Sequence, residues 1–546
     1  CEEAGKTEGS HCGRCNEILK EQEEIPATGH NEVIDSAIEP GCETPGKTEG
    51  SHCSVCDKIL QKQEEIAATG HNWDEGVVNK KPTETETGER TYTCKSCGAV
   101  RKEVIDKNVR ADGTTGSIKW ILYNDGKLVL RGNNTALYRD PIYEVWNRYK
   151  NYIFEVSVED GITKVGMSTF SGWSNIERVT ILGNVTAIDA DAFADCTSLE
   201  AVSLSEGLES ISSHAFENCN NLTEIVFPES VTEIGKGAFW GCSKLKKAEL
   251  PQGISEISDA IFGNCLNLKH VTIPDNVTYI GSQAFYGCEN LAELILPKNL
   301  KGLGKEAFGG CKKITSIVIP EGVTTLPEYL FNTCENLKSV TIPETVTEID
   351  QRVFQNCSSL TGIELPSGII NIQEGTFCSC AALTEIVIPE NVRNIGDNAF
   401  SGCYSLEKVT FPAVLKNIGS GAFASCGSLK EIAVPDRVGS IGSSAFSGCF
   451  NLETVKLSKN LTEISDSTFE YCYNIRRIEI PESVTDIKQN AFCSCENLSI
   501  ITIPNTVTEI ANTAFSERIG LSVIRYTGSK VEWDKYGLTE DDINHA

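Results

Sequence analysis

A motif of 23 residues recurs without insertion or deletion through sixteen consecutive units, from residue 156 to residue 523. One unit begins Val271-Thr272-Ile273-Pro274, with apolar residues at positions 1 and 3 and proline at position 4. The alternation predicts a short strand, and proline, which has no N–H for a sheet ladder, ends it. A fixed period of this length predicts a stacked solenoid, in which each unit covers the apolar face of its neighbour.

Three other positions of the unit predict its interior. Position 15 is phenylalanine in every unit, from Phe170 to Phe515, so we expect a continuous internal stack of rings. Position 18 is cysteine in fourteen units, from Cys196 to Cys495. A disulfide needs Cα atoms within about 7 Å, so we expect these equivalent positions to hold free, buried thiols that act as small hydrophobes. Leucine at position 21 completes Leu-x-x-Val-x-Ile, the strand signature of leucine-rich repeats.

Phenylalanine, cysteine, leucine and proline all fall in register with a known repeat. Residues 156–523 resemble the 23-residue, BspA-like (treponemal-type) leucine-rich repeat of bacterial surface proteins. The resemblance implies a β-rich α/β solenoid: a right-handed leucine-rich-repeat horseshoe with a parallel sheet on its concave side. Short strands and 3-10 or helical turns are expected on the convex side. It also implies surface display and binding to proteins or glycans, without catalysis.

The remaining segments differ from this repeat. An apolar alternation on both sides of Asn124-Asp125-Gly126 predicts a β-hairpin. We therefore predict five segments: a Cys/His-rich repeat at 1–41, a second with a decayed third copy at 42–107, a β-rich N-terminal cap at 108–155, the leucine-rich repeats at 156–523 and a C-terminal cap at 524–546.

Composition narrows the class of partner. The 546 residues carry a formal net charge of -28. This charge argues against nucleic acid and anionic membranes as partners, because proteins bind both of them through Lys and Arg side chains. No apolar run approaches 18 residues, so no membrane insertion is expected. The chain begins inside a Cys/His repeat and shows no signal peptide, so we expect its signal and anchor to lie outside this chain. We also expect a monomer, and the family resemblance implies a place outside the cell or at the cell surface.

The outward residue of each predicted strand, at position 2, is the candidate ligand-binding position. Several of these residues are apolar, although a merely solvated face would be polar. The alternative is that β-branched residues are present only as good strand formers. The nine candidate residues are Val226, Glu249, Thr272, Ile295, Val318, Thr341, Glu364, Val387 and Thr410.

Three functions follow as alternatives. The favoured one is protein–protein interaction or adhesion through the concave face, with host or bacterial surface proteins as partners. The second is a carbohydrate-binding scaffold within a larger surface polysaccharide-binding protein. The third is an enzyme, which is disfavoured because the unbroken register leaves no inserted loop for an active site. The outward position-2 carboxylates Glu249 and Glu364 are five units apart, roughly 24 Å at the strand spacing, too far for glycosidase chemistry.

Residues 1–107 carry a different repeat, of 41 residues. Its cysteines and histidine recur in two copies, and a third copy keeps only Cys94 and Cys97. Thiolate and imidazole at Cys-x-x-Cys spacing suit tetrahedral zinc, and a metal would supply folding energy to a module with little core. Disulfides and loose thiols remain alternatives. The segments resemble small Cys/His repeats that accompany surface repeats in gut Firmicutes. The candidate ligands are Cys1, Cys12, Cys15, His30, Cys42, Cys53, Cys56 and His71.

The spacing leaves two groupings of these ligands open. Each copy closes its own site in the first: Cys1, Cys12, Cys15 and His30 form one, and Cys42, Cys53, Cys56 and His71 form the other. In the second, His30 joins Cys42, Cys53 and Cys56, and the first copy is incomplete. No cofactor is required for the leucine-rich repeats.

Overall fold

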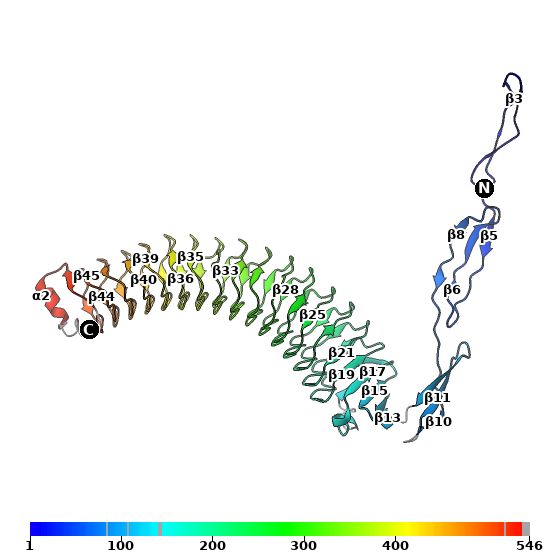
Figure 1. The fold of residues 1–546 in the computed structure, drawn as a ribbon, viewed down its shortest axis with the longest axis horizontal. Coiled ribbons are helices and arrows are strands. Elements are labelled where there is room, and N and C mark those ends of the chain that lie inside the picture. Colours follow the sequence, from blue (N-terminus) through cyan, green and yellow to red (C-terminus); the bar gives the residue numbers. More distant parts are fainter. Residues whose placement is uncertain (83–85, 106–108, 140–144, 518–519, 538–546) are drawn as a thin grey trace. The chain divides into compact units, whose positions relative to one another are not determined.

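A computed structural model describes residues 1–82, 86–105, 109–139, 145–517 and 520–537 (Figure 1). The chain divides into two compact units, Cys1–Val109 (unit 1) and Arg110–Ala546 (unit 2). Residues 108 and 140–144 of the predicted N-terminal cap, residues 106–107 of the predicted second segment and residues 538–546 of the predicted C-terminal cap lie outside the described residues. None of the described helices is long and apolar enough to cross a bilayer.

Unit 1 consists of short antiparallel strands. The three-stranded sheets β5-β7-β8 and β10-β11-β12 have the same plan, with a Cys-x-x-Cys segment between their last two strands. The strands are β1 (Gly5–Lys6), β2 (Ser10–His11), β3 (Ile18–Lys20), β4 (Glu24–Ile25), β5 (Glu32–Asp35), β6 (Gly46–Lys47), β7 (Gly50–Cys53), β8 (Ile59–Gln61), β9 (Glu65–Ile66), β10 (Val77–Lys80), β11 (Gly88–Thr93) and β12 (Val100–Ile105).

Unit 1 has almost no hydrophobic core. Cys53 and Cys94 are the only buried apolar side chains among its described residues. Ile18, Val55 and Ile59, which would form a core in a larger domain, are each more than 60% exposed. Burial of apolar surface therefore contributes little to holding these strands together.

Unit 2 is a curved row of stacked turns, cyan to red in Figure 1. Successive turns pair in parallel and in register, so that Lys247 lies opposite His270, 23 residues later. This confirms a leucine-rich-repeat-type β-solenoid. The strands of this first stripe are β17 (Glu155–Val158), β19 (Arg178–Ile181), β21 (Ala201–Ser203), β23 (Ile225–Val226), β25 (Lys247–Glu249), β27 (His270–Thr272), β30 (Ser316–Val318), β32 (Ser339–Thr341), β35 (Glu385–Val387), β37 (Lys408–Thr410), β39 (Glu431–Ala433), β41 (Thr454–Lys456), β43 (Arg477–Glu479), β45 (Ile500–Ile503) and β47 (Val523–Tyr526).

A second stripe of mostly two-residue parallel strands follows the proline turn of each unit. The described residues between 156 and 517 contain no helix or 3-10 turn, so of the structures predicted for the other side of the solenoid only the short strands form. The second-stripe strands are β18 (Ile162–Val165), β20 (Ala187–Ile188), β22 (Ser210–Ile211), β24 (Glu233–Ile234), β26 (Glu256–Ile257), β28 (Tyr279–Ile280), β29 (Gly302–Leu303), β31 (Thr325–Leu326), β33 (Glu348–Ile349), β34 (Asn371–Ile372), β36 (Asn394–Ile395), β38 (Asn417–Ile418), β40 (Ser440–Ile441), β42 (Glu463–Ile464), β44 (Asp486–Ile487) and β46 (Glu509–Ile510).

The segment around each phenylalanine forms a third ladder, which is not a β-ladder. The N–H groups of Gln283, Phe285 and Gly287 donate to carbonyls of the next turn, at 2.7–2.9 Å. The N–H groups between them bond within their own turn, as that of Ala284 does to Gly281. This alternation uses left-handed residues at positions 13 and 17, here Gln283 (φ 55°) and Gly287 (φ 69°). Left-handed backbone costs about 1 kcal/mol or more at a non-glycine residue, so the surrounding packing must hold it in place.

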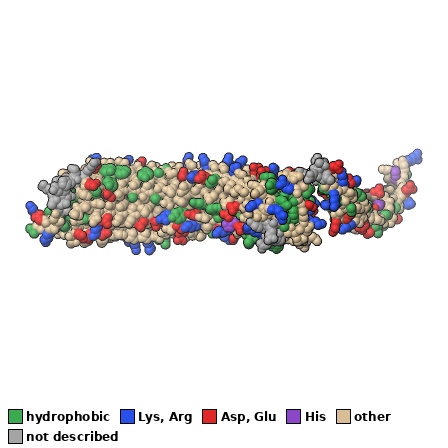
Figure 2. All heavy atoms as spheres, turned by 90° about the horizontal axis from the view of Figure 1, so that it is seen from below, with side chains coloured by type: hydrophobic (Ala, Val, Ile, Leu, Met, Phe, Trp, Pro, Cys, Tyr) green, Lys and Arg blue, Asp and Glu red, His purple; other side chains and the backbone are tan. Residues whose placement is uncertain are grey.

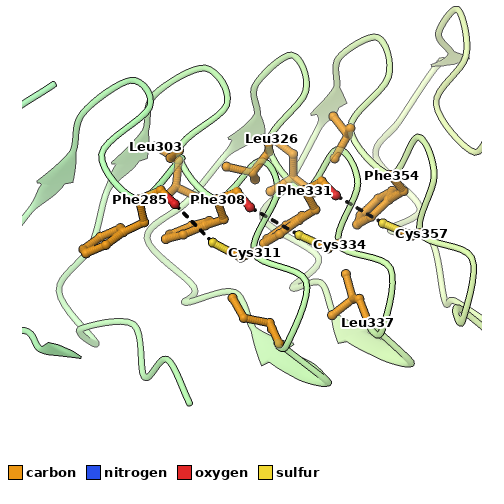
Figure 3. Close-up of a cluster of buried hydrophobic side chains, with 14 of the residues drawn as sticks. Phe285, Leu303, Phe308, Cys311, Leu326, Phe331, Cys334, Leu337, Phe354 and Cys357 are labelled. Atoms are coloured by element: carbon orange, nitrogen blue, oxygen red, sulfur yellow. Dashed lines mark hydrogen bonds between the residues drawn. The ribbon is translucent and has the colours of Figure 1, made fainter. Parts of the chain in front are cut away.

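The predicted phenylalanine stack is present and continuous. All sixteen rings, from Phe170 to Phe515, are buried. Neighbouring ring centroids lie 5.1–5.9 Å apart, with planes within 20° of parallel. Figure 3 shows the portion from Phe285 to Phe354. This stack explains how the left-handed residues on either side of it are maintained.

The fourteen position-18 cysteines are free and fully buried, as predicted. Each thiol donates a hydrogen bond to the carbonyl of the phenylalanine one turn back; Cys311 reaches Phe285 and Cys334 reaches Phe308, at 3.2 and 3.3 Å (Figure 3). Burial raises the pKa of Cys196 and of Cys334 to about 12. These thiols are therefore packing groups that also bond consecutive turns.

Both ends of the solenoid have their own structure. Four strands precede it: β13 (Val109–Thr115), β14 (Ile118–Tyr123), β15 (Lys127–Arg131) and β16 (Thr135–Leu137). The predicted hairpin forms between β14 and β15, and β15 then pairs in parallel with β17. The helical segments with described bounds are η1 (Lys150–Tyr152) before the first turn, and α2 (Lys530–Trp533) and η2 (Asp534–Tyr536) after the last. Ser529 and Glu532 form a capping box at the start of α2.

Candidate binding face and metal sites

All nine predicted position-2 residues are exposed. Seven of them lie on strands of the first stripe, and Ile295 and Glu364 lie in turns that lack this strand. We call the nine residues the binding column. Its apolar members are strongly exposed: Ile295 at 85%, Val226 at 71%, and Val318 and Val387 at 64% each. Their neighbours at position 1, such as Ile317, are buried, as expected for alternating strand residues. The column is therefore accessible along its whole length, and its apolar members remain in contact with solvent.

The centre of the binding column lacks charge. Between Glu293 and Glu364, the two outward positions of each turn carry only uncharged residues. These positions, 23 and 2 of each unit, hold six residues, of which Gly362 has no side chain. We call the other five the uncharged window: Ile295, Ser316, Val318, Ser339 and Thr341. Depletion of charge around exposed apolar residues is typical of the buried centre of a protein interface.

The surface is hollowed along this part of the column. Ile295, Val318 and Thr341 line an open groove of about 650 Å³. Glu364 and Val387 line the next hollow, of about 790 Å³. Both hollows include turns in which the first-stripe strand is lost, at residues 294–296 and 363–365. The sequence pattern did not predict these interruptions, because the period is unbroken there.

The face seen in Figure 2 carries acidic and basic side chains interspersed along the solenoid, with hydrophobic patches between them. No extended basic surface is visible on this face.

Unit 1 contains two clusters of three cysteines and one histidine. Within each cluster, the possible ligand atoms all lie within 4.8 Å of one another. The first consists of Cys1, His30, Cys53 and Cys56, and the second of Cys42, His71, Cys94 and Cys97.

Neither grouping derived from sequence is the one the structure shows. Each cluster takes its first cysteine and its histidine from one copy and its Cys-x-x-Cys pair from the next. Cys12 and Cys15 belong to neither cluster, and Cys94 and Cys97 of the third copy complete the second one. The sequence spacing is compatible with this third grouping, because each ligand of the second cluster lies 41 residues after its counterpart in the first.

All three Cys-x-x-Cys segments have the same turn. The N–H of the residue after the second cysteine donates to the carbonyl of the first cysteine, at 2.9 Å, and that residue is left-handed in each case. The three left-handed residues are Asn16, Asp57 and Gly98, types that adopt this backbone readily. The third copy is therefore intact at its Cys-x-x-Cys turn, although its other ligand positions have diverged.

Backbone N–H groups favour the thiolate form of the first cysteine in these turns. Val55 contributes most at Cys53, and with His30 and other donors it outweighs burial and lowers the pKa of Cys53 to about 6. At Cys94, burial would raise the pKa, but the N–H groups of Cys97 and Ser96, together with His71, lower it to about 5.

A carboxylate orients each histidine, and the sequence analysis missed both. Nε2 of His30 lies 2.9 Å from Glu2, and Nε2 of His71 lies 2.8 Å from Glu43. Each glutamate follows the first cysteine of its own cluster, which was the available clue. These carboxylates raise the pKa of each histidine to about 9, and the cysteines add to the effect. Nδ1 of each histidine then faces a cysteine sulfur, 3.5 Å away at Cys56 and 3.4 Å at Cys97.

Comparison with known families concerns unit 2. Matches to the BspA type leucine rich repeat region, a model of six copies, overlap continuously from residue 148 to residue 538. The chain belongs to the BspA-type leucine-rich-repeat family. This match confirms the resemblance of residues 156–523 to BspA-like repeats.

Several solved structures resemble this BspA-type protein. A leucine-rich repeat protein from Bacteroides ovatus is 24% identical with a TM-score of 0.53, over 78% of this chain and 100% of that one. A leucine rich cell surface protein from Faecalibacterium prausnitzii is 26% identical with a TM-score of 0.33, over 78% and 97%. A leucine-rich repeat protein from Eubacterium ventriosum is 28% identical with a TM-score of 0.46, over 61% and 93%. The Bacteroides ovatus structure supports the fold alone. None of the curated proteins compared is significantly similar in sequence.

Proposed function

We propose that this BspA-type protein is a non-catalytic surface or secreted protein that binds a protein partner through the binding column. The observation that carries the proposal is the exposure of Ile295 and Val318 in the uncharged window, beside an open groove. Burial of two such side chains in a partner is favourable, and the window itself carries no charge, although Lys298 and Glu321 also line the groove.

The charge around the window indicates the kind of partner. Glu293, Glu364 and Glu385 lie on the outward positions beyond it, and the chain as a whole is acidic. We therefore expect an apolar contact surface bordered by Lys or Arg on the partner, since complementary charge favours encounter and register. Extracellular proteins, of a host or of another bacterium, are the partner class that the family resemblance suggests.

Arrays of purified mammalian extracellular proteins and of glycans, both probed with the full chain, test this proposal. We expect specific binding on the protein array that is lost in the variant Ile295→Asp/Val318→Asp, with affinity at least about 30-fold weaker, as for a hot spot worth about 2 kcal/mol or more. The matched control is Ile370→Asp, which changes an apolar side chain that is 51% exposed at position 8, outside the column. It should bind as the unmodified chain does.

Two outcomes would contradict the proposal. Equal binding by the double variant and the control, with unchanged circular dichroism, would remove the window from the interface. Binding confined to the glycan array would favour the carbohydrate-binding scaffold instead.

A further inference from the structure

We propose that the two Cys/His clusters of unit 1 are structural zinc sites, and that each ion joins two consecutive 41-residue repeats. This inference is independent of the binding column. It rests on the distances within the clusters, the carboxylates behind the histidines and the absence of a hydrophobic core in the described part of unit 1.

The distances fit a tetrahedral zinc ion. With Zn–S near 2.3 Å and Zn–N near 2.0–2.1 Å, a tetrahedron has edges of about 3.8 Å between sulfurs and about 3.6 Å between sulfur and nitrogen. The sulfurs of Cys1 and Cys53 are 3.5 Å apart, and those of Cys42 and Cys94 are 3.7 Å apart. The sulfur-to-nitrogen distances, at 3.4 and 3.5 Å, agree equally well. A disulfide would need sulfurs about 2.05 Å apart, and all eight cysteines of unit 1 are free.

The ligand set identifies the metal class and the role of the site. Three thiolates and one imidazole are typical of zinc in structural sites, in which all four positions are filled by protein. No position remains for water or substrate, so the ion would not be catalytic.

The outer partners of the histidines support the same conclusion. Histidine that binds zinc usually donates its other N–H to a carboxylate, which fixes the tautomer and the ring orientation. Glu2 and Glu43 occupy this position in the two clusters. Residues 1–30 and 42–71 are identical at most positions, so the same outer partner recurs because the 41-residue repeat recurs.

The sharing of ligands gives the ions a mechanical role. Cys1 and His30 come from the first copy, and Cys53 and Cys56 from the second; the second copy then supplies Cys42 and His71 to the next cluster. Each ion therefore closes a loop of about fifty residues across a repeat boundary, where burial supplies almost nothing. Removal of either ion would disconnect two neighbouring repeats.

Zinc content of the full chain, purified without chelators, tests this proposal directly. We expect two ions per chain, one for each cluster. Replacement of zinc by Co²⁺ should give the visible absorption of tetrahedral cobalt with thiolate ligands. Retention of less than half an equivalent of zinc, or a disulfide between Cys1 and Cys53 by mass spectrometry, would overturn the assignment.

A pair of cysteine variants tests the sharing of ligands between copies. Cys94→Ser should lose one of the two ions, whereas Cys12→Ser, the matched change in the unclustered turn, should keep both. If each copy closed its own site, the two results would be reversed. His71→Ala should also lose one ion, which excludes the grouping that uses His30 with Cys42. Unchanged thermal unfolding of the solenoid in every variant would show that loss of the zinc ion affects unit 1 alone.

Discussion

Unit 1 and unit 2 are both built from short strands in tandem repeats, yet their strands are held together in different ways. Each turn of unit 2 places a ring and several aliphatic side chains against the same groups of the next turn, and fourteen turns add a thiol, so its core is continuous. Unit 1 buries two apolar side chains among its described residues, and both are cysteines of the proposed zinc sites. The comparison shows that repetition alone does not produce a core, because the 41-residue repeat has few apolar positions that face one another.

Cysteine illustrates the difference most clearly. In unit 2, burial raises the pKa of Cys196 to about 12, so the thiol stays neutral. In unit 1, N–H groups and a histidine lower the pKa of Cys94 to about 5, despite the opposing effect of burial. The same residue type is therefore a neutral packing group at Cys196, whereas at Cys94 the thiolate form that the proposed zinc site requires is favoured.

Alkylation should show the largest contrast between the units. With iodoacetamide at pH 8, a thiol of pKa about 12 is thiolate in roughly one part in ten thousand, and the buried position-18 cysteines should remain unlabelled. With zinc bound, only Cys12 and Cys15 of unit 1 should react quickly; a chelator should expose the other six. Peptide mapping by mass spectrometry measures each site. Rapid labelling of Cys334 in the native chain would contradict the continuous core.

Truncation of a ring in the phenylalanine stack should have the next largest effect. Phe331→Ala removes a buried ring between two others and should destabilise the solenoid by about 3–5 kcal/mol. Ile59→Ala in unit 1 removes a side chain that is 64% exposed and should change stability by less than about 0.5 kcal/mol. Denaturant unfolding followed by circular dichroism gives both values, and equal effects would show that the two units do not differ in this way.

Loss of the carboxylate that contacts a zinc-binding histidine should have a smaller effect, confined to unit 1. Glu43→Gln removes the charge behind His71 and should weaken zinc binding about 10–100-fold at one site. Glu65→Gln, an exposed change of the same type on β9, should leave both sites unaltered. Competition with a fluorescent chelator measures the affinities, and no difference between the two variants would remove the outer-shell role of Glu43.

Much of unit 2 could be predicted because each position of its repeat has one environment. Phe331 and Cys334 occupy the same interior positions as their counterparts in other turns, so the period and the residue type together predict their burial. The left-handed residues were not predicted, because they include Gln283, Glu306 and Tyr329 as well as glycine. The groove at Ile295 was also missed, because its strand is lost without any change in the repeat.

Unit 1 was predicted less well for a physical reason. The residue types pointed to metal ligands, but a ligand set depends on which segments meet in space, and Cys-x-x-Cys spacing specifies only half of it. Cys1 meets Cys53 across a repeat boundary, so grouping by copy was wrong. Glu2 and Glu43 could have been noticed, since each follows a ligand cysteine at the same point of the repeat.

Amide hydrogen exchange of the full chain, with and without a zinc chelator, tests most directly the claim that a core stabilises unit 2 and metal ions stabilise unit 1. The account predicts that protection of β5, β7, β8 and β10 to β12 falls to that of an unfolded chain when zinc is removed, while the first and second stripes of unit 2 are unchanged. Equal protection of unit 1 in the presence and absence of the chelator would contradict it.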